Sequence, residues 1–236
     1  PVCFANANAA GYVHEPTFEQ VERELRQLLD CRPIPCTCVQ FSGGEPTLHP
    51  RWLDIVRRAR ELGMTNIQAA TNGLKFADPD FARRSQDAGL HSLYLQFDGL
   101  DERIYRRVRG VPLLEKKLQA IENCRRTGIK VCLVPTVIRG ENEDQVVKIL
   151  DFAVENADVV SGISYQPVCF TGRISRRELE KKRYTLGHLA HALAEHTGAE
   201  LERDFFPLSF MAPLSNILSA VEKKPKITCS CHSDCA

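Results

Sequence analysis

The chain has 236 residues, of which 43% are hydrophobic and 26% are charged, which is ordinary for a globular protein with a full core. Its formal net charge of +1 gives no broad attraction to nucleic acid or to a membrane surface. No apolar run approaches the roughly 20 residues that a membrane-spanning helix needs. We therefore expect a cytoplasmic protein that neither crosses a membrane nor binds nucleic acid.

Cysteine is the exception in this composition, with ten residues. No secretory feature supports a disulfide framework, and a chain of this length does not need one. In a reducing compartment an excess of cysteine indicates metal or iron–sulfur ligation. Buried thiols are common and usually inert, so four cysteines are interpreted as interior residues: Cys31, Cys124, Cys132 and Cys169.

Helix and strand patterns alternate along the chain. Residues 1–12 predict a loop, and Thr17 and Gln20 then form a capping box in front of an apolar stripe. Helices are predicted at residues 17–29, 51–62 (with Pro50 at its start), 78–88, 113–126 (after a shorter helical piece), 144–156 and 177–196. The strands predicted between them are residues 38–41, 66–70, 91–97, 129–137 and 158–166.

This alternation predicts an α/β fold. Strands that alternate with helices indicate a parallel sheet with right-handed crossovers. The loop at residues 1–12 also precedes a helix, so we expect a first strand upstream of Pro1 that is missing from this chain. Six strand–helix units would form a partial (β/α)6 TIM-like barrel over residues 1–200. Residues 201–236 are expected to form a C-terminal extension with a cysteine-rich tail.

Polar residues and glycines follow the predicted strands. In a parallel barrel the functional site lies at the C-terminal ends of the strands. The residues predicted at that edge are Cys3, Gly43, Gly44, Glu45, Thr71, Asn72, Gln96, Asp98, Arg139 and Gln166. Each alone has an ordinary interpretation as a turn or as a solvated side chain. Their convergence on one edge favours a binding site.

The turn at Gly43, Gly44 and Glu45 organises this edge. Two glycines let the backbone turn sharply and let a ligand come close to bare backbone groups. Glu45 adds a carboxylate at the same point. The pattern predicts a strand–loop–helix turn that holds a small molecule with a positive group. A glycine turn with a solvated glutamate is the alternative.

Two stretches together resemble the radical S-adenosylmethionine (SAM) superfamily. They are the run Pro-Val-Cys-Phe-Ala at residues 1–5 and Gly-Gly-Glu-Pro at residues 43–46. The signature of that family is C-x3-C-x2-C in the first loop, where three thiolates hold a [4Fe–4S] cluster. The resemblance makes Cys3 the third ligand. The other two cysteines are expected upstream of Pro1, so that the chain starts inside the motif.

The resemblance implies a reaction and a cofactor. A [4Fe–4S] cluster would cleave SAM reductively, giving a 5′-deoxyadenosyl radical that abstracts hydrogen from an unactivated C–H bond. Such chemistry needs a reductant such as ferredoxin or flavodoxin. It also implies that Gly43 and Gly44 lie along the methionine amino group of SAM, with the Glu45 carboxylate accepting hydrogen bonds from the ammonium.

The same resemblance implies roles at the other strand ends. Thr71, Asn72 and Gln96, joined by Asp98, correspond to where the family binds the ribose or the sulfonium side of SAM. Arg139 would meet the methionine carboxylate, where a guanidinium can form paired hydrogen bonds. Gln166 corresponds to the region that holds adenine.

The tail predicts a second metal site. Cys229, Cys231 and Cys235, with His232, offer three thiolates and an imidazole within seven residues. That donor set suits an auxiliary iron–sulfur cluster or zinc. A tail with free thiols is the alternative.

The Cys-Phe-Ala-Asn run, the Leu-Gln-Phe-Asp-Gly run at residues 95–99 and the tail resemble one subgroup of the superfamily. It contains tetraether lipid synthase and pterin-methylating enzymes. This implies C–C bond formation on an isoprenoid lipid, with a peripheral membrane location, or methylation of a pterin-like substrate. One rival hypothesis is a non-catalytic iron–sulfur or SAM-binding module with a degenerate cluster motif. Another is a barrel enzyme acting on phosphorylated metabolites, which lacks a glycine-rich phosphate loop near the last strands.

Overall fold

A five-stranded parallel sheet forms the centre of the protein in the computed structural model, which describes residues 11, 14–32, 35–168, 176–206, 213, 217, 218, 220 and 221. The strand order is β1-β2-β3-β4-β6. These strands are β1 (Cys38–Phe41), β2 (Asn66–Thr71), β3 (Ser92–Gln96), β4 (Lys130–Val134) and β6 (Val160–Ile163). Two short strands, β5 (Thr136–Val137) and β7 (Gln166–Pro167), pair in parallel beyond β4 and β6. The predicted α/β fold with a parallel sheet is confirmed.

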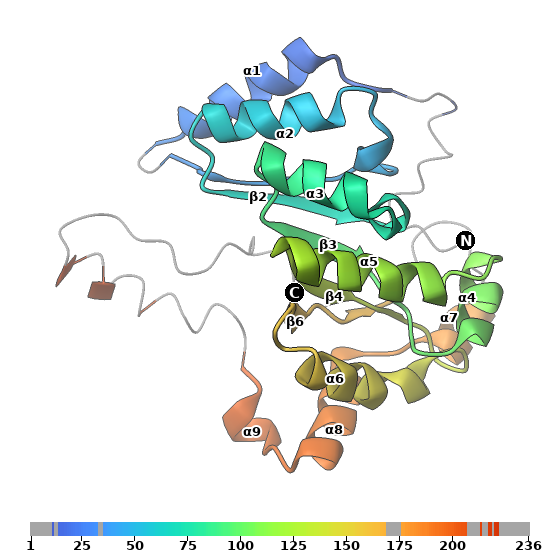
Figure 1. Ribbon diagram of the computed structural model, residues 1–236. Helices are drawn as coiled ribbons and strands as arrows, with labels where there is room; N and C mark the ends of the chain where they lie inside the picture. The colour runs from blue at the N-terminus through green and yellow to red at the C-terminus, as the bar shows by residue number, and fades with distance from the viewer. Residues whose placement is uncertain are drawn as a thin grey trace.

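Helices pack along one face of this sheet (Figure 1). They are α1 (Phe18–Leu29), α2 (Trp52–Glu61), α3 (Pro79–Ala88), α5 (Leu114–Thr127) and α6 (Val146–Glu155). The shorter α4 (Glu102–Arg109) lies beside the strand ends, and α7 (Arg176–Lys182), α8 (Leu186–Thr197) and α9 (Leu201–Asp204) follow β7. Short 3-10 helices occur at η2 (Pro46–Leu48), η3 (Leu74–Ala77) and η4 (Glu143–Gln145). In the described part of the chain, no helix has the length and hydropathy of a membrane span.

The two faces of the sheet differ in burial. Successive side chains of a strand point to opposite faces. In β2 and β3 the alternate residues Ile67, Ala69, Leu93 and Leu95 are fully buried under the helices. The residues between them are only partly buried. The core therefore lies between the sheet and the helices, and the opposite face is more open.

The strand register aligns the C-terminal ends. Thr71 at the end of β2 pairs with Leu95 in β3, and Gln96 at the end of β3 pairs with Val134 at the end of β4. The loops after β1, β2 and β3 therefore leave the sheet next to one another. This alignment brings residues that are distant in the sequence to one edge.

Proline breaks one predicted strand. The single strand expected at residues 129–137 is two strands, β4 and β5, separated by Pro135. Proline has no N–H group to donate to the sheet, so the ladder is interrupted there. The Pro135 carbonyl oxygen still accepts a hydrogen bond from the Gln166 backbone N–H, at 2.9 Å. The expected strand at 158–166 is likewise divided into β6 and β7.

Two helix predictions were also wrong. The helix expected at residues 177–196 is divided into α7 and α8, because Thr185 caps a new helix start through a capping box with His188. Pro50 does not begin a helix, since α2 starts at Trp52. The proline at a helix start is instead Pro46, in η2, which Glu45 caps.

Candidate functional site

The Glu45 carboxylate connects the end of β1 to the end of β2. Its Oε1 accepts hydrogen bonds from the Thr47 backbone N–H (3.2 Å), the Thr47 hydroxyl (2.6 Å) and the Thr71 hydroxyl (2.7 Å). Its Oε2 accepts one from the Asn72 backbone N–H, at 2.7 Å. A carboxylate offers about four lone-pair positions, two on each oxygen, so Oε2 can accept a further donor. Glu45 is half-buried, and the interpretation as a solvated glutamate is wrong.

The glycines before Glu45 form an open turn. Gly43 has φ 147°, a conformation that favours glycine. Among the described residues, a Cβ added to Gly43 or to Gly44 would meet no atom within 4 Å, and both glycines are exposed. The turn therefore leaves space beside bare backbone.

Thr71 and Asn72 turn the chain after β2. The Thr71 hydroxyl accepts a hydrogen bond from the Gly73 backbone N–H at 3.0 Å, and the Asn72 Oδ1 accepts one from the Leu74 N–H at 2.9 Å. Gly73 has φ 76°, and a Cβ there would lie 2.3 Å from Leu95 Cδ1. The chain therefore passes the end of β3 closely, with Thr71 and Asn72 both tied to Glu45.

A buried lysine that the sequence analysis missed lies beneath these loops. Lys117 comes from α5, and its side chain is fully enclosed. Its ammonium group donates hydrogen bonds to the carbonyl oxygens of Asn72 (2.5 Å) and Gln96 (2.8 Å). Burial lowers the pKa of Lys117 to about 8. The signal was available in the sequence, because Lys117 falls in the apolar stripe of α5 with Ala120, Ile121 and Cys124.

Asp98 is the second buried carboxylate of this edge. It has no exposed surface, and both of its oxygens accept hydrogen bonds from the Arg109 guanidinium, at 2.8 and 2.9 Å. The Gln96 amide also donates to Asp98, at 3.1 Å, and the Thr136 N–H donates at 3.3 Å. Asp98 therefore belongs to a paired structural network that joins β3, α4 and β5.

Asn142 supports the same loop from the side of η4. Its amide nitrogen donates to the carbonyl oxygens of Asp98 and Thr136, both at 2.9 Å. Its Oδ1 accepts from the Ile138 N–H at 2.8 Å. Asn142 is buried, so these three bonds satisfy it and fix the loop after β3 against β5.

The remaining predicted residues do not join these contacts. Arg139 and Gln166 are both exposed. Their backbone N–H groups bond to the carbonyl oxygens of Lys182 (3.2 Å) and Pro135 (2.9 Å). Neither side chain has a hydrogen bond or ion pair to another described residue. The structure thus brings together Glu45, Thr71, Asn72, Gln96 and Asp98, and leaves these two apart.

The cysteines predicted to bind metal, Cys3, Cys229, Cys231 and Cys235, lie outside the described residues, as does Cys169. Within the described part of the chain, no three His, Cys, Asp or Glu side chains are grouped so that they could hold a metal ion. Cys124 is buried, as predicted, and burial raises the pKa of its thiol to about 12. Cys132 is half-buried, whereas Cys31 is exposed, so the interior prediction was wrong for Cys31.

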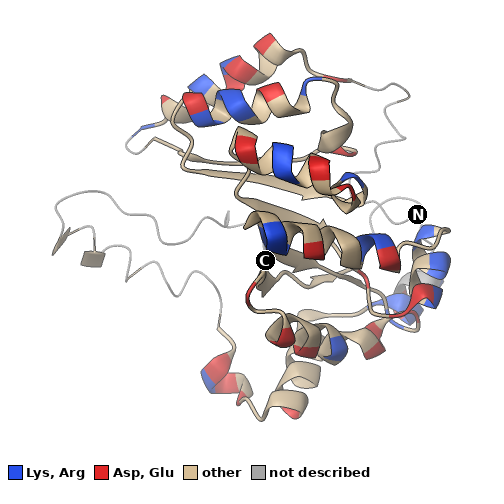
Figure 2. Ribbon diagram, viewed as in Figure 1, with Lys and Arg blue, Asp and Glu red and all other residues tan. Residues whose placement is uncertain are grey.

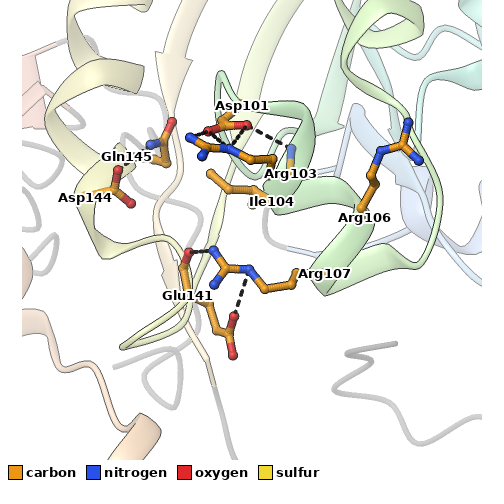
Figure 3. Close-up of a pocket in the computed structure, with 8 residues that line it drawn as sticks. All are labelled: Asp101, Arg103, Ile104, Arg106, Arg107, Glu141, Asp144 and Gln145. Atoms are coloured by element: carbon orange, nitrogen blue, oxygen red, sulfur yellow. Dashed lines mark hydrogen bonds and ion pairs between the residues drawn. The ribbon is translucent and has the colours of Figure 1, made fainter.

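A cavity of about 440 Å³ lies beside α4 (Figure 3), and Glu45 is not among the residues that line it. Its lining is Asp101, Arg103, Ile104, Arg106, Arg107, Glu141, Asp144 and Gln145. Figure 2 shows that α4 is rich in basic residues, but three of its arginines are paired, including Arg109 with Asp98. Arg103 bonds to Asp101 at 2.5 Å, and Arg107 lies 3.4 Å from Glu141. These charges are largely compensated.

Comparisons with known proteins show which family the chain resembles. A family model described as "Radical SAM superfamily" matches residues 1–153. The 7,8-dihydro-6-hydroxymethylpterin dimethyltransferase of Methanocaldococcus jannaschii is 41% identical over 237 residues, covering 100% of this chain and 47% of that protein. A probable GTP 3′,8-cyclase of Sulfurisphaera tokodaii is 28% identical over 131 residues, covering 55% of this chain and 41% of that protein. The chain thus spans about half the length of the curated relatives it matches.

A solved structure shows the same fold. A domain of a pyruvate-formate lyase-activating enzyme from Bacteroides vulgatus superposes with a TM-score of 0.54 at 18% identity. The match covers 68% of this chain and 92% of that one.

Proposed function

The chain belongs to the radical SAM superfamily of enzymes, and from this we propose that it binds SAM at the edge formed by the ends of β1, β2 and β3. We further propose that the complete protein methylates a pterin-like substrate. The observation that carries the first proposal is the Glu45 carboxylate, held between two strand ends beside an open glycine turn. The printed name of the M. jannaschii relative supports the second.

The residues at this edge fit the methionine end of SAM. An ammonium group needs acceptors, and Glu45 Oε2 has a free lone-pair position beside the exposed backbone of Gly43 and Gly44. The hydrogen bonds from Thr71 and Asn72 hold the carboxylate in place before a ligand arrives. Because the side chain is already ordered, less free energy is lost in ordering it when the ligand binds.

Arg139 and Gln166 are proposed as the groups for the methionine carboxylate and the adenine, as the family resemblance implies. Both side chains are exposed, so they are accessible to a ligand. Gln96 is proposed for the ribose side. Asp98 supports it by accepting the hydrogen bond of its amide, at 3.1 Å.

Cys3 is proposed as one ligand of a [4Fe–4S] cluster, and Cys229, Cys231 and Cys235 as ligands of an auxiliary cluster or of zinc. When bound and reduced, the cluster supplies the electron that cleaves SAM and releases a 5′-deoxyadenosyl radical for hydrogen abstraction. A small acidic reductant such as ferredoxin or flavodoxin is the proposed electron source. Besides holding the cluster, this chain would bind and orient SAM.

The open face of the sheet favours a polar substrate over an isoprenoid chain. The side chains that alternate with the buried core residues in β1, β2 and β3 are mostly amides and hydroxyls: Gln40, Gln68, Ser92, Tyr94 and Gln96. Gln40 and Gln68 bond to each other at 3.4 Å across the two strands. A pterin carries ring nitrogens and an amide that can bond to such groups, whereas a lipid chain would leave them unpaired.

The test uses the full-length protein, reconstituted anaerobically with iron and sulfide and then given dithionite and SAM. We expect 5′-deoxyadenosine, and with 7,8-dihydro-6-hydroxymethylpterin added we expect a methylated pterin by mass spectrometry. Absence of 5′-deoxyadenosine from a protein with a complete cluster would contradict the reaction. Formation of 5′-deoxyadenosine without any change in the pterin would contradict only the substrate. The variant Cys3→Ala should lose the visible absorbance of the cluster, and retention would remove Cys3 as a ligand.

A further inference from the structure

The proposed SAM-binding edge rests on a buried ammonium group. Lys117 is fully enclosed, although a lysine is almost never buried without partners. Its neighbours in the apolar stripe of α5, Ala120 and Cys124, pack in the core. A leucine or methionine at this position would satisfy that packing without a buried charge. The lysine is therefore explained by what its ammonium group contacts.

Lys117 lies where two chains of hydrogen bonds meet. Its bond to the Asn72 carbonyl oxygen continues from the N–H of the same residue to Glu45 Oε2, at 2.7 Å. It also donates to the backbone carbonyl oxygen of Gln96, and the side-chain amide of the same residue donates to Asp98, at 3.1 Å. One side chain thus ties the loop after β2 to the end of β3.

We propose that Lys117 is a positioning residue for SAM: its ammonium group fixes the ends of β2 and β3 relative to each other and thereby holds the Glu45 carboxylate in its binding position. The inference rests on the proposed function, since it concerns the same edge. It assigns a role to a side chain that does not touch the ligand. Removing Lys117 would leave two carbonyl oxygens without their partner and would loosen the loop that carries Asn72.

Two carboxylates and one guanidinium surround the Lys117 ammonium group. The charged groups that face Lys117 are the carboxylates of Asp98, after β3, and Glu45, after β1, together with the Arg109 guanidinium from α4. Burial lowers the pKa of Lys117 to about 8; the two carboxylates raise it and Arg109 lowers it. Above that pH the amine is neutral, and its hydrogen bonds to the carbonyl oxygens are weaker than those of the ammonium.

The pH dependence of stability and of SAM affinity distinguishes a positioning role of Lys117 from a purely stabilising one. An unfolded lysine keeps its proton up to a pKa of about 10.4. Between pH 8 and that value the unfolded chain binds more protons than the folded one, so the Lys117 contribution to the free energy of unfolding increases with pH. The affinity for SAM should fall over the same range. A lysine that served stability alone would not move the two quantities in opposite directions.

The experiment compares Lys117→Met with Lys116→Met in the full-length, reconstituted protein. Lys116 is the exposed neighbour on α5, so its variant removes the same charge without touching the strand ends. Isothermal titration calorimetry with SAM at pH 7 should show affinity about tenfold weaker in Lys117→Met, because charge-assisted bonds are lost, and unchanged in Lys116→Met. Equal affinity in wild type and Lys117→Met overturns the inference.

A second calorimetric titration, at pH 9, tests whether the effect of Lys117 on SAM affinity depends on its positive charge. The amino group of SAM titrates in a similar range, so the difference between wild type and Lys117→Met is the informative quantity. We expect that difference to shrink at pH 9. A difference that stays constant overturns the role of the ammonium charge.

Hydrogen–deuterium exchange tests the inference without SAM. The amides of residues 71–73 and 96–98 should exchange faster in Lys117→Met, relative to amides in α6, and unchanged rates overturn it. If Lys117→Met does not fold, wild-type exchange decides, because the protection of these amides relative to α6 should fall between pH 7 and pH 9. Failure of the wild type to bind SAM contradicts the proposed function, while the exchange result still tests how Lys117 holds the strand ends.

Discussion

The residues proposed to bind SAM form two halves, which differ in how their side chains are held. After β1, β2 and β3, the groups Glu45, Thr71, Asn72 and Asp98 are joined to one another and to Lys117 and Arg109 by hydrogen bonds. Arg139, after β5, and Gln166, in β7, are exposed and have no side-chain bond to another described residue. The first half is held by hydrogen bonds without a ligand, whereas the described part of the chain gives the side chains of the second half no hydrogen-bond partner. Substitutions in the first half should therefore affect stability and binding together, and those in the second half binding alone.

The largest effect on stability is expected at Asp98. Asp98→Asn removes the charge that pairs with Arg109 in a buried, two-bond geometry. Leaving a buried charge without its partner costs about 3–5 kcal/mol of unfolding free energy. Chemical denaturation followed by circular dichroism measures it, with the exposed Asp80→Asn as the control. A loss below about 1 kcal/mol, the range of exposed pairs, would mean that the ion pair is not buried in solution.

Glu45→Gln should have the next largest effect. The amide keeps one acceptor oxygen but places an NH₂ group against either the Asn72 N–H or the two threonine hydroxyls. A buried donor left without its acceptor costs up to about 3 kcal/mol. The same change removes the negative charge proposed to meet the SAM ammonium, so the affinity for SAM should fall in calorimetry. Unchanged affinity with reduced stability would limit Glu45 to a structural role.

A pair of glycine substitutions tests how tightly β2 passes β3. Gly73 and Gly140 have nearly equal positive φ angles, 76° and 78°. A Cβ at Gly73 would lie 2.3 Å from Leu95 Cδ1, whereas one at Gly140 would meet no atom of the described chain within 4 Å. Gly73→Ala should therefore lower the free energy of unfolding by about 2 kcal/mol more than Gly140→Ala, which is a typical cost of overpacking a core. Thermal or chemical unfolding measures the difference. Equal costs would show that the backbone angle alone matters at both sites.

The smallest change in stability is expected in the exposed half. Arg139→Ala and Gln166→Ala should each alter the free energy of unfolding by less than about 0.5 kcal/mol, because surface substitutions usually do. Both should nevertheless weaken SAM binding if the proposed contacts form. A large loss of stability in either variant would contradict the contrast between the two halves.

The sequence predicted the architecture well because burial follows the periods of strands and helices. The alternation of Ile67 and Ala69 in β2, for instance, corresponds to the face beneath the helices. The polar residues after β1, β2 and β3 were predicted to meet, and the parallel register explains why they do. The breaks at Pro135 and Thr185 were missed although proline and capping residues signal them.

The contacts of the site could be predicted only in part. Lys117 was missed because the apolar residues of its helical stripe indicate only that this face of α5 is buried. They do not show which groups a lysine on that face contacts. The pairing of Asp98 with Arg109 depends on the path of a loop and on the reach of a long side chain from α4. Neither the path of a loop nor the reach of a side chain produces a periodic pattern in the sequence. The same limit applies to Glu45, whose four hydrogen-bond donors come from Thr47, Thr71 and Asn72.

The most direct test of the proposed site is a crystal structure of the full-length, reconstituted protein with SAM bound. We predict that the methionine amino nitrogen lies at hydrogen-bond distance, about 3 Å, from Glu45 Oε2, with the Thr71 and Asn72 bonds to the carboxylate intact. A SAM molecule bound elsewhere, or one whose amino group does not contact Glu45 or the Gly43–Gly44 backbone, would contradict it.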